Sequence, residues 1–219
     1  MGEPPMLDAL EPNAFPSGQA FEEIEARARA IAARRTLRID VPDAHALHVA
    51  TLARDVAARI GLPRNDVAVV VEGALLHDVG KTLVPRAILA KRRPLDRLEY
   101  ATVKLHPDWG FEIVGSDVAP RAALAIRHHH ERWDGCGYPA RLAADDIPLE
   151  ARIVGIADAF AAMREKRPYR PAKSRDAALL ELERNAGTQF DPELVEPLIE
   201  SAAREEEPRL RLLPRLRFH

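Results

Sequence analysis

The stretch His77-Asp78-Val79-Gly80-Lys81 places a histidine and a carboxylate side by side, directly after an apolar run from Val67 to Leu76. That run is apolar on almost every face, which predicts a buried helix. A carboxylate at the inner end of such a helix is costly unless it is paired with a cation or bound to a metal. The pentapeptide alone fits a surface aspartate beside a core histidine equally well. Histidines and aspartates in similar settings further along the chain favour the metal site.

Bulk composition describes an ordinary globular chain. Its 219 residues fit one domain with appendages, and 47% of them are hydrophobic and 30% charged. A net charge of -2 offers no field for a nucleic acid polymer, which we exclude as a partner. No apolar run approaches the roughly 20 residues of a membrane span, and Glu3 and Asp8 stand where a signal peptide is basic. We therefore expect no membrane association. Cys136 alone cannot close an intrachain disulfide, so we expect the protein in the reducing cytoplasm.

We expect three segments along the chain. Residues 1–40 form a proline-bearing leader and a helix from Ser17 to about Ala33, residues 41–203 form the main domain, and residues 204–219 form a charged tail. The N-terminal helix could pack on the core, join a homodimer or bind another protein. The sequence does not choose among these roles.

Periodicity and caps predict an all-α fold with no convincing strand. Expected helices run from about Asp43 to Ile60, from Asn65 as a cap to Leu76, and from the capping box Asp96–Glu99 to Val114. Four more are expected near residues 120–131, 150–163, 175–186 and 192–203. The long irregular segment that reaches about residue 148 is of a size that is usually functional.

Most of the eight histidines, together with Asp78 and Asp158, fall at expected helix ends or on apolar faces. Imidazole nitrogen combined with carboxylate oxygen suits Fe, Mn, Zn or Ni and differs from the all-oxygen sites of Mg or Ca. The adjacent His77 and Asp78 indicate one carboxylate bridging two metals. Metals about 3.5–4 Å apart can hold a hydroxide and clamp a phosphate for in-line attack. A scatter of core histidines explains any one of these residues better, but not the whole set.

The same residues resemble the HD-GYP domain, a branch of the HD phosphohydrolases that hydrolyses cyclic di-GMP. The stretch from His129 to Pro139, HHERWDGCGYP, is highly specific, and the resemblance covers roughly residues 41–203. The other matching blocks, in the same order as in the family, are His77-Asp78-Val79-Gly80-Lys81, Ile88-Leu89-Ala90-Lys91, His106-Pro107-Asp108-Trp109-Gly110, Ile156-Ala157-Asp158, Arg167-Pro168-Tyr169-Arg170 and Phe190-Asp191-Pro192.

The resemblance implies an all-α, HD-type helical bundle with two divalent transition-metal ions, Fe or Mn before others. One metal would take His45, His77, Asp78 and Asp158. The other would take His106, His129 and His130, with Asp78 as the bridge. Consecutive helical residues are about 100° apart, so His128 cannot face the same site as both of its successors.

The resemblance also implies the residues that act on the substrate. Lys81 would contact the phosphate, and Asp78 would hold both metals during catalysis. The signature loop would contribute Gly135, Gly137 and Tyr138 to substrate binding, and the later segment would contribute Arg167, Tyr169 and Arg170. An arginine can pair with phosphate and a tyrosine can stack on guanine, although ordinary loop packing explains each of these singly as well.

The function implied is hydrolysis of cyclic di-GMP to linear pGpG, and to GMP after a second cleavage, by a metal-bridging hydroxide. Two departures affect this expectation: Val41 stands where three-metal members carry Glu, and Ala161 stands where many carry a second Asp. We therefore expect two metals and not three. Two alternatives stay open: a cyclic-dinucleotide-sensing module with slow or no turnover, and an HD phosphohydrolase for another nucleotide, such as a mixed cyclic dinucleotide.

Overall fold

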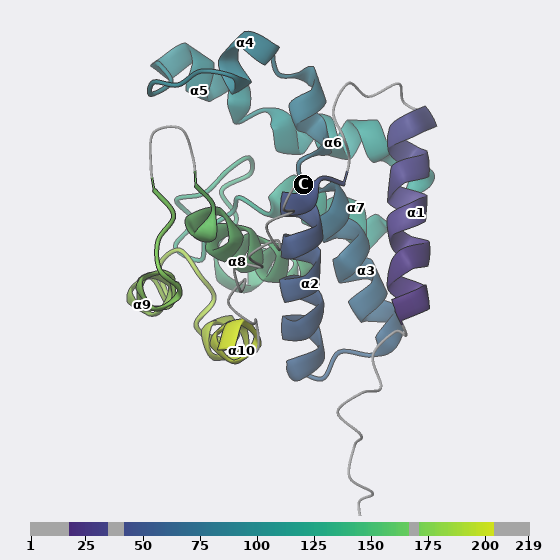
Figure 1. Cartoon of the computed structure of the whole chain (residues 1–219), viewed down its shortest axis with the longest axis vertical. Helices are drawn as coiled ribbons and strands as arrows, with labels where there is room; N and C mark the ends of the chain where they lie inside the picture. Colours follow the sequence, from purple (N-terminus) through teal and green to yellow (C-terminus); the bar gives the residue numbers. More distant parts are fainter. Residues whose placement is uncertain (1–17, 35–41, 167–170, 204–219) are drawn as a thin grey trace, which may run out of the picture.

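The computed structural model describes residues 18–34, 42–166 and 171–203, and within these ranges the chain is helical with no β-strand (Figure 1). The all-α expectation is confirmed. The α-helices are α1 (Gly18–Arg34), α2 (Ala44–Arg59), α3 (Arg64–Leu76), α4 (Arg86–Leu89), α5 (Arg97–Val103), α6 (His106–Val114), α7 (Pro120–His128), α8 (Leu149–Arg164), α9 (Arg175–Arg184) and α10 (Pro192–Ala203). Short 3-10 helices span Val79–Leu83 (η1), Gly115–Asp117 (η2) and Ala144–Asp146 (η3).

Helix α3 is the centre of the bundle. It packs against α1, α2, α7 and α8, and Val70, Val71 and Leu76 on it are fully buried. A helix with neighbours on several sides must be apolar all round, and this explains the unbroken run in its sequence. The buried end of α3 carries His77, so the site begins inside the core.

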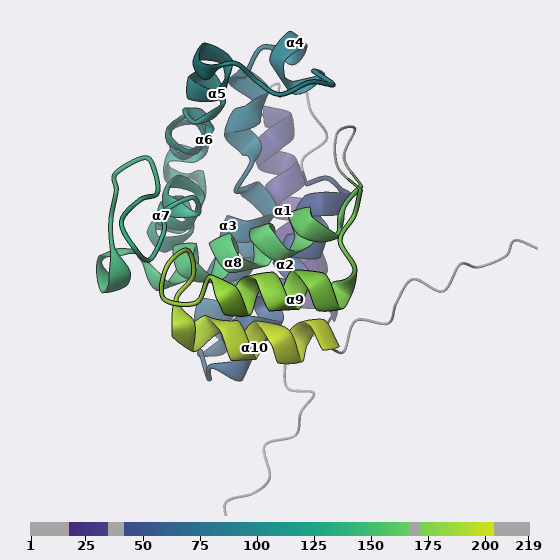
Figure 2. The ribbon, with the colours of Figure 1, turned by 90° about the vertical axis from the view of Figure 1, so that its left-hand side faces the viewer.

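The remaining helices surround this core. Figure 2 shows α8, α9 and α10 stacked one above another, while α4 and α5 lie at one end of the molecule. Helix α1 packs on α3 through the buried Ala28 and Ile31, so among its three expected roles the structure shows packing on the core. Its part in a homodimer or a protein complex stays a prediction, as do the segment boundaries at 41 and 203. The leader to Ser17 and the tail from residue 204 lie outside the described residues.

Local signals fixed several helix starts correctly. The Asp43 carboxylate accepts from the Ala46 N–H at 2.9 Å and begins α2. The capping box of Asp96 and Glu99 is present at the start of α5. The expected cap at Asn65 is wrong, because Pro63 holds the N-cap position of α3 without a side-chain hydrogen bond.

The single helix expected from Asp96 to Val114 is also wrong, because α5 ends at Val103 and α6 begins at His106. Pro107 is the reason. It has no N–H to donate to the carbonyl of Val103, four residues earlier, so the helical hydrogen-bond ladder is broken there. The break turns His106 toward the core. None of the described helices is long and apolar enough to pass through a lipid bilayer.

Candidate metal centre

Three histidines lie just after the last residues of α3, α5 and α7, and each is oriented by the same local hydrogen bond. The Nδ1 of His77, His106 and His129 lies 2.7, 2.8 and 2.8 Å from the carbonyl oxygen three residues earlier, on Ala74, Val103 and Ile126 respectively. Carbonyls in the last turn of a helix have no partner within the helix, so the imidazole N–H satisfies them. A donor at Nδ1 leaves Nε2 unprotonated in the neutral ring, which is the form that binds metals.

For His106 this bond has a specific cause. Its Nδ1–H donates to the Val103 oxygen that Pro107 leaves without a helical donor. The Pro107 that breaks the helix therefore also frees the carbonyl that orients the imidazole.

The imidazole rings form one cluster. Successive ring centroids lie 5.5 Å apart for His45 and His77, 5.1 Å for His77 and His129, and 4.1 Å for His129 and His130. His106 completes the cluster at 5.4 Å from His129 and 5.0 Å from His130. Helices α2, α3, α6 and α7 thus bring together five histidines that are spread over 86 positions, from 45 to 130.

Asp78 lies within this cluster. Its Oδ1 is 3.3 Å from Nε2 of His106, its Oδ2 is 3.5 Å from Nε2 of His77, and it forms an ion pair with Lys81. Two sets of possible ligands, each with its ligand atoms within 4.8 Å of one another, share Asp78: one adds His106, His129 and His130, and the other adds His45 and His77.

Asp158, on α8, adjoins the second set. Its Oδ1 is 3.0 Å from Nε2 of His45 and 3.9 Å from Nε2 of His77. Every residue that the sequence assigns to the metals is therefore brought to one place. His128 is buried but belongs to neither set, since its Nδ1 lies 3.5 Å from Glu131.

These residues fit a divalent metal ion. The Nε2 of His77 and the Oδ1 of Asp78 are buried and have no hydrogen-bond partner among the described residues. Leaving such atoms unpaired costs about 1–3 kcal/mol each, more where charge is involved. A metal ion would remove that cost, and a mixed set of imidazole and carboxylate donors suits transition metals.

Electrostatics hold His129, His130 and Asp78 in the protonation state that binds metals. Burial lowers the pKa of His130 to about 3 and moves the pKa of His129 well below 6.5, so both rings are neutral at pH 7. Burial would raise the pKa of Asp78, but the ammonium of Lys81 and the adjacent imidazoles of His77 and His106 outweigh it and hold that pKa well below 3.8. Asp78 is therefore a carboxylate at neutral pH.

His45 is the exception, and it reveals a residue that the sequence analysis missed. Burial lowers the pKa of His45, but Asp158 and Glu165 outweigh it and raise the pKa to about 9. Oε1 of Glu165 lies 2.7 Å from Nδ1 of His45, on the side away from Asp158. Glu165 follows Asp158 by seven residues, two helical turns, so that spacing was the available signal.

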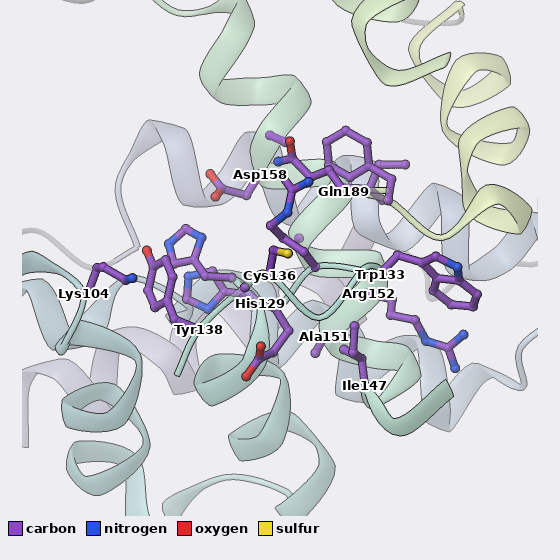
Figure 3. Close-up of a pocket in the computed structure, with 18 of the residues that line it drawn as sticks. Lys104, His129, Trp133, Cys136, Tyr138, Ile147, Ala151, Arg152, Asp158 and Gln189 are labelled. Carbon is purple, nitrogen blue, oxygen red and sulfur yellow. The ribbon is translucent and has the colours of Figure 1, made fainter. Parts of the chain in front are cut away.

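A cavity of about 500 Å³ opens over the cluster, within the roughly 300–1,000 Å³ of small-molecule sites. Four of the cluster residues line the cavity: His106, His129, His130 and Asp158. Lys81, which pairs with Asp78, lines it as well. Figure 3 shows Lys104 and Tyr138 at one side and Trp133 at the other, with His129 and Cys136 between them. The cavity can therefore place a ligand directly against the histidine cluster.

The signature loop forms part of the cavity wall. A Cβ on Gly137 would lie 2.4 Å from the backbone nitrogen of Arg132, so only glycine lets the loop fold back this closely. The Tyr138 ring packs on His130 with centroids 4.9 Å apart. Gly135 adopts φ +73° and makes the turn, but it is not among the residues that line the cavity. Arg167, Tyr169, Arg170 and Val41 lie outside the described residues.

Comparison with known proteins agrees with this geometry. The HD domain family model matches residues 15–194. The chain belongs to the HD domain family. The resemblance read from the motifs is thereby confirmed.

This HD domain is 37% identical over 199 residues to the cyclic di-GMP phosphodiesterase response regulator RpfG of Xanthomonas campestris pv. campestris, covering 86% of this chain and 52% of the relative. It is 39% identical over 160 residues to 3'3'-cGAMP-specific phosphodiesterase 2 of Vibrio cholerae, covering 72% and 31% respectively. A cyclic di-GMP phosphodiesterase of Thermotoga maritima is 36% identical over 158 residues, covering 71% and 43%. The chain thus spans about half or less of the length of these relatives.

Solved structures share the fold. A HDG"Y"P protein from Bdellovibrio bacteriovorus superposes with a TM-score of 0.63 at 21% identity, covering 84% of this chain and 61% of that one. A cyclic GMP-AMP-specific phosphodiesterase of Vibrio cholerae superposes with a TM-score of 0.54 at 17% identity, covering 84% and 49%. These likenesses establish the HD-type helical bundle of this HD domain.

Proposed function

We propose that this HD domain is a metal-dependent phosphodiesterase that hydrolyses cyclic di-GMP to linear pGpG, with GMP as the product of a second cleavage. The observation that carries the proposal is the pair of ligand sets that share Asp78 beside a cavity of about 500 Å³. The names of the relatives RpfG and the Thermotoga maritima protein support the choice of substrate.

The proposed cofactors are two divalent ions, Fe or Mn. His45, His77 and Asp158 would hold one, His106, His129 and His130 the other, and Asp78 would belong to both sets. When bound, such ions would supply an activated water and stabilise negative charge on the phosphoryl oxygens. The hydrogen bonds at Nδ1 of His77, His106 and His129 keep the rings from turning, so the site is organised before any ligand arrives.

Other residues of this chain would bind and orient the substrate. Lys81 extends from η1, where its ammonium pairs with Asp78 and also lines the cavity, so it is placed to counter charge on a phosphate held at the cluster. Tyr138 presents an aromatic ring beside His130, against which a base or sugar can pack. Gly137 allows the close loop that positions Tyr138, and Gly135 supports its turn.

A mixed cyclic dinucleotide is the second candidate substrate. Two relatives with 39% and 38% identity are named 3'3'-cGAMP-specific phosphodiesterases 2 and 3 of Vibrio cholerae. Their identities to this chain are as high as those of the cyclic di-GMP enzymes, so identity alone does not separate the two substrates.

A substrate panel tests the proposal. Protein purified without oxygen and loaded with Fe or Mn is incubated with cyclic di-GMP, 3',3'-cGAMP and cyclic di-AMP, and the products are separated by chromatography. We expect pGpG to form first from cyclic di-GMP, and no product after removal of metal with a chelator. Faster turnover of 3',3'-cGAMP would favour the second candidate. Binding of the dinucleotides without any product would refute the enzymatic proposal.

A further inference from the structure

The cavity carries four cationic side chains among the residues that the structure describes, and three of them are already paired with carboxylates. Lys81 pairs with Asp78. Arg132 donates to Asp134 from Nε at 3.0 Å and from a terminal nitrogen at 2.7 Å. Arg152 lies 2.7 Å from Asp191 and 3.0 Å from Asp145. Their charges are therefore largely balanced within the protein.

Lys104 differs from these three. It is half-buried at the C-terminal end of α5, and no carboxylate of the described ranges lies within ion-pair distance of its ammonium. Its Nζ lies 4.6 Å from the ring centroid of Tyr138 and 5.6 Å from that of Tyr100. Aromatic faces attract a cation but do not neutralise its charge. Among the four cavity cations of the described residues, Lys104 is therefore the one whose charge is available to pair with an anionic ligand.

The place of Lys104 relative to the metal ligands is also specific. The Tyr138 ring contacts both Lys104 and a metal-ligand candidate: its centroid lies 4.6 Å from Nζ of Lys104 and 4.9 Å from the centroid of the His130 ring. Figure 3 shows Lys104 beside Tyr138 on the wall of the cavity. Together these two distances put the ammonium no more than about 9.5 Å from the centroid of the His130 ring, and Lys81 and Lys104 both line the cavity. One ligand can therefore place one phosphate at the cluster beside Lys81 and a second phosphate beside Lys104.

We propose that Lys104 binds the second phosphate of a bound cyclic dinucleotide, the one that is not being cleaved. This inference rests on the proposed function, because it takes the scissile phosphate to lie at the cluster beside Lys81. A cyclic dinucleotide carries its second phosphate on the opposite side of the macrocycle, and Lys104 is the cavity cation of the described ranges that no carboxylate balances. Lys104 would therefore select for substrates with two phosphates over simple phosphodiesters.

The test compares two substrates in three variants. Cyclic di-GMP carries two phosphates, whereas bis(p-nitrophenyl) phosphate carries one. Lys104→Met keeps the length of the side chain and removes the charge, and Lys104→Arg restores the charge. Lys173→Met is the matched control, since Lys173 pairs with Glu181 and is not among the residues that line the cavity.

We expect Lys104→Met to raise KM for cyclic di-GMP by about 10- to 100-fold, the range for losing one hydrogen bond to a charged group. Its kcat, and both constants for bis(p-nitrophenyl) phosphate, would stay close to wild type. Lys104→Arg would recover most of the loss, and Lys173→Met would behave as wild type. An unchanged KM for cyclic di-GMP, or an equal loss on both substrates, would overturn the assignment. A wild-type protein that cleaves no cyclic dinucleotide would instead refute the proposed function.

Discussion

The ion pair of Glu165 with His45 makes a quantitative prediction about the metal-free protein. The pKa of His45 rises from 6.5 to about 9 in the folded chain. At about 1.4 kcal/mol per pH unit, this corresponds to at most about 3.5 kcal/mol of stabilisation of the imidazolium. The effective value is smaller, because the Glu165 side chain is 38% exposed and solvent screens its charge.

The direction of the pH dependence follows from this pKa. A pKa that is higher in the folded than in the unfolded chain stabilises the fold fully below pH 6.5, and this contribution is lost as pH rises to about 9. Glu165→Gln would lower the pKa of His45 in the folded protein. We therefore expect the variant to be destabilised by about 1–2 kcal/mol at pH 6.5, part of the bound above, and to match wild type above pH 9.

Urea unfolding of chelator-treated protein at pH 6.5 and at pH 9.5 measures this difference. Glu181→Gln, which breaks the Lys173 ion pair on the surface, is the matched control and should show little change at either pH. A Glu165→Gln effect that is equal at both pH values, or larger at pH 9.5, would refute the role of Glu165. The same proton must leave before His45 binds a metal, so the affinity of Mn²⁺ for the His45 set should rise about tenfold per pH unit toward pH 9.

Three further predictions concern the cluster. Asp78→Asn should lose at least one metal and nearly all hydrolysis, because a neutral amide is a poor bridge between two metal ions. Elemental analysis measures the metal content: two metals retained in the variant would contradict the bridge, and three tightly held metals in wild type would contradict the count of two. Lys81→Ala should keep its metals but slow kcat by roughly 10²–10³ at saturating substrate, so an unchanged kcat would exclude its role. Gly80→Ala should cost about 1–3 kcal/mol or more of unfolding free energy, since its Cβ would lie 1.9 Å from the His106 oxygen. Urea unfolding measures this loss, and a variant as stable as wild type would contradict the prediction.

The fold and the members of the cluster could be predicted because they depend on local patterns. Caps such as Asp43 and Asp96 and the apolar run before His77 identify helices from neighbouring residues alone. The break at Pro107 was available in the same way, since a proline four residues after Val103 removes a helical hydrogen bond. The prediction of a single helix there was wrong because it relied on the apolar periodicity and neglected the missing N–H of Pro107.

The amino-acid sequence by itself identified the histidines and aspartates that the structure brings into one cluster, because residue types and motif spacing are properties of the chain. It also determined how three of the imidazoles are oriented, since their partners are carbonyls only three residues away. Only the tertiary structure decided that Glu165 meets His45 across 120 positions and that Lys104 faces the cavity without a carboxylate partner in the described ranges. Both depend on how separate helices pack. The seven-residue spacing from Asp158 puts Glu165 on the same side as that ligand, but only the packing of α2 against α8 brings His45 between the two carboxylates.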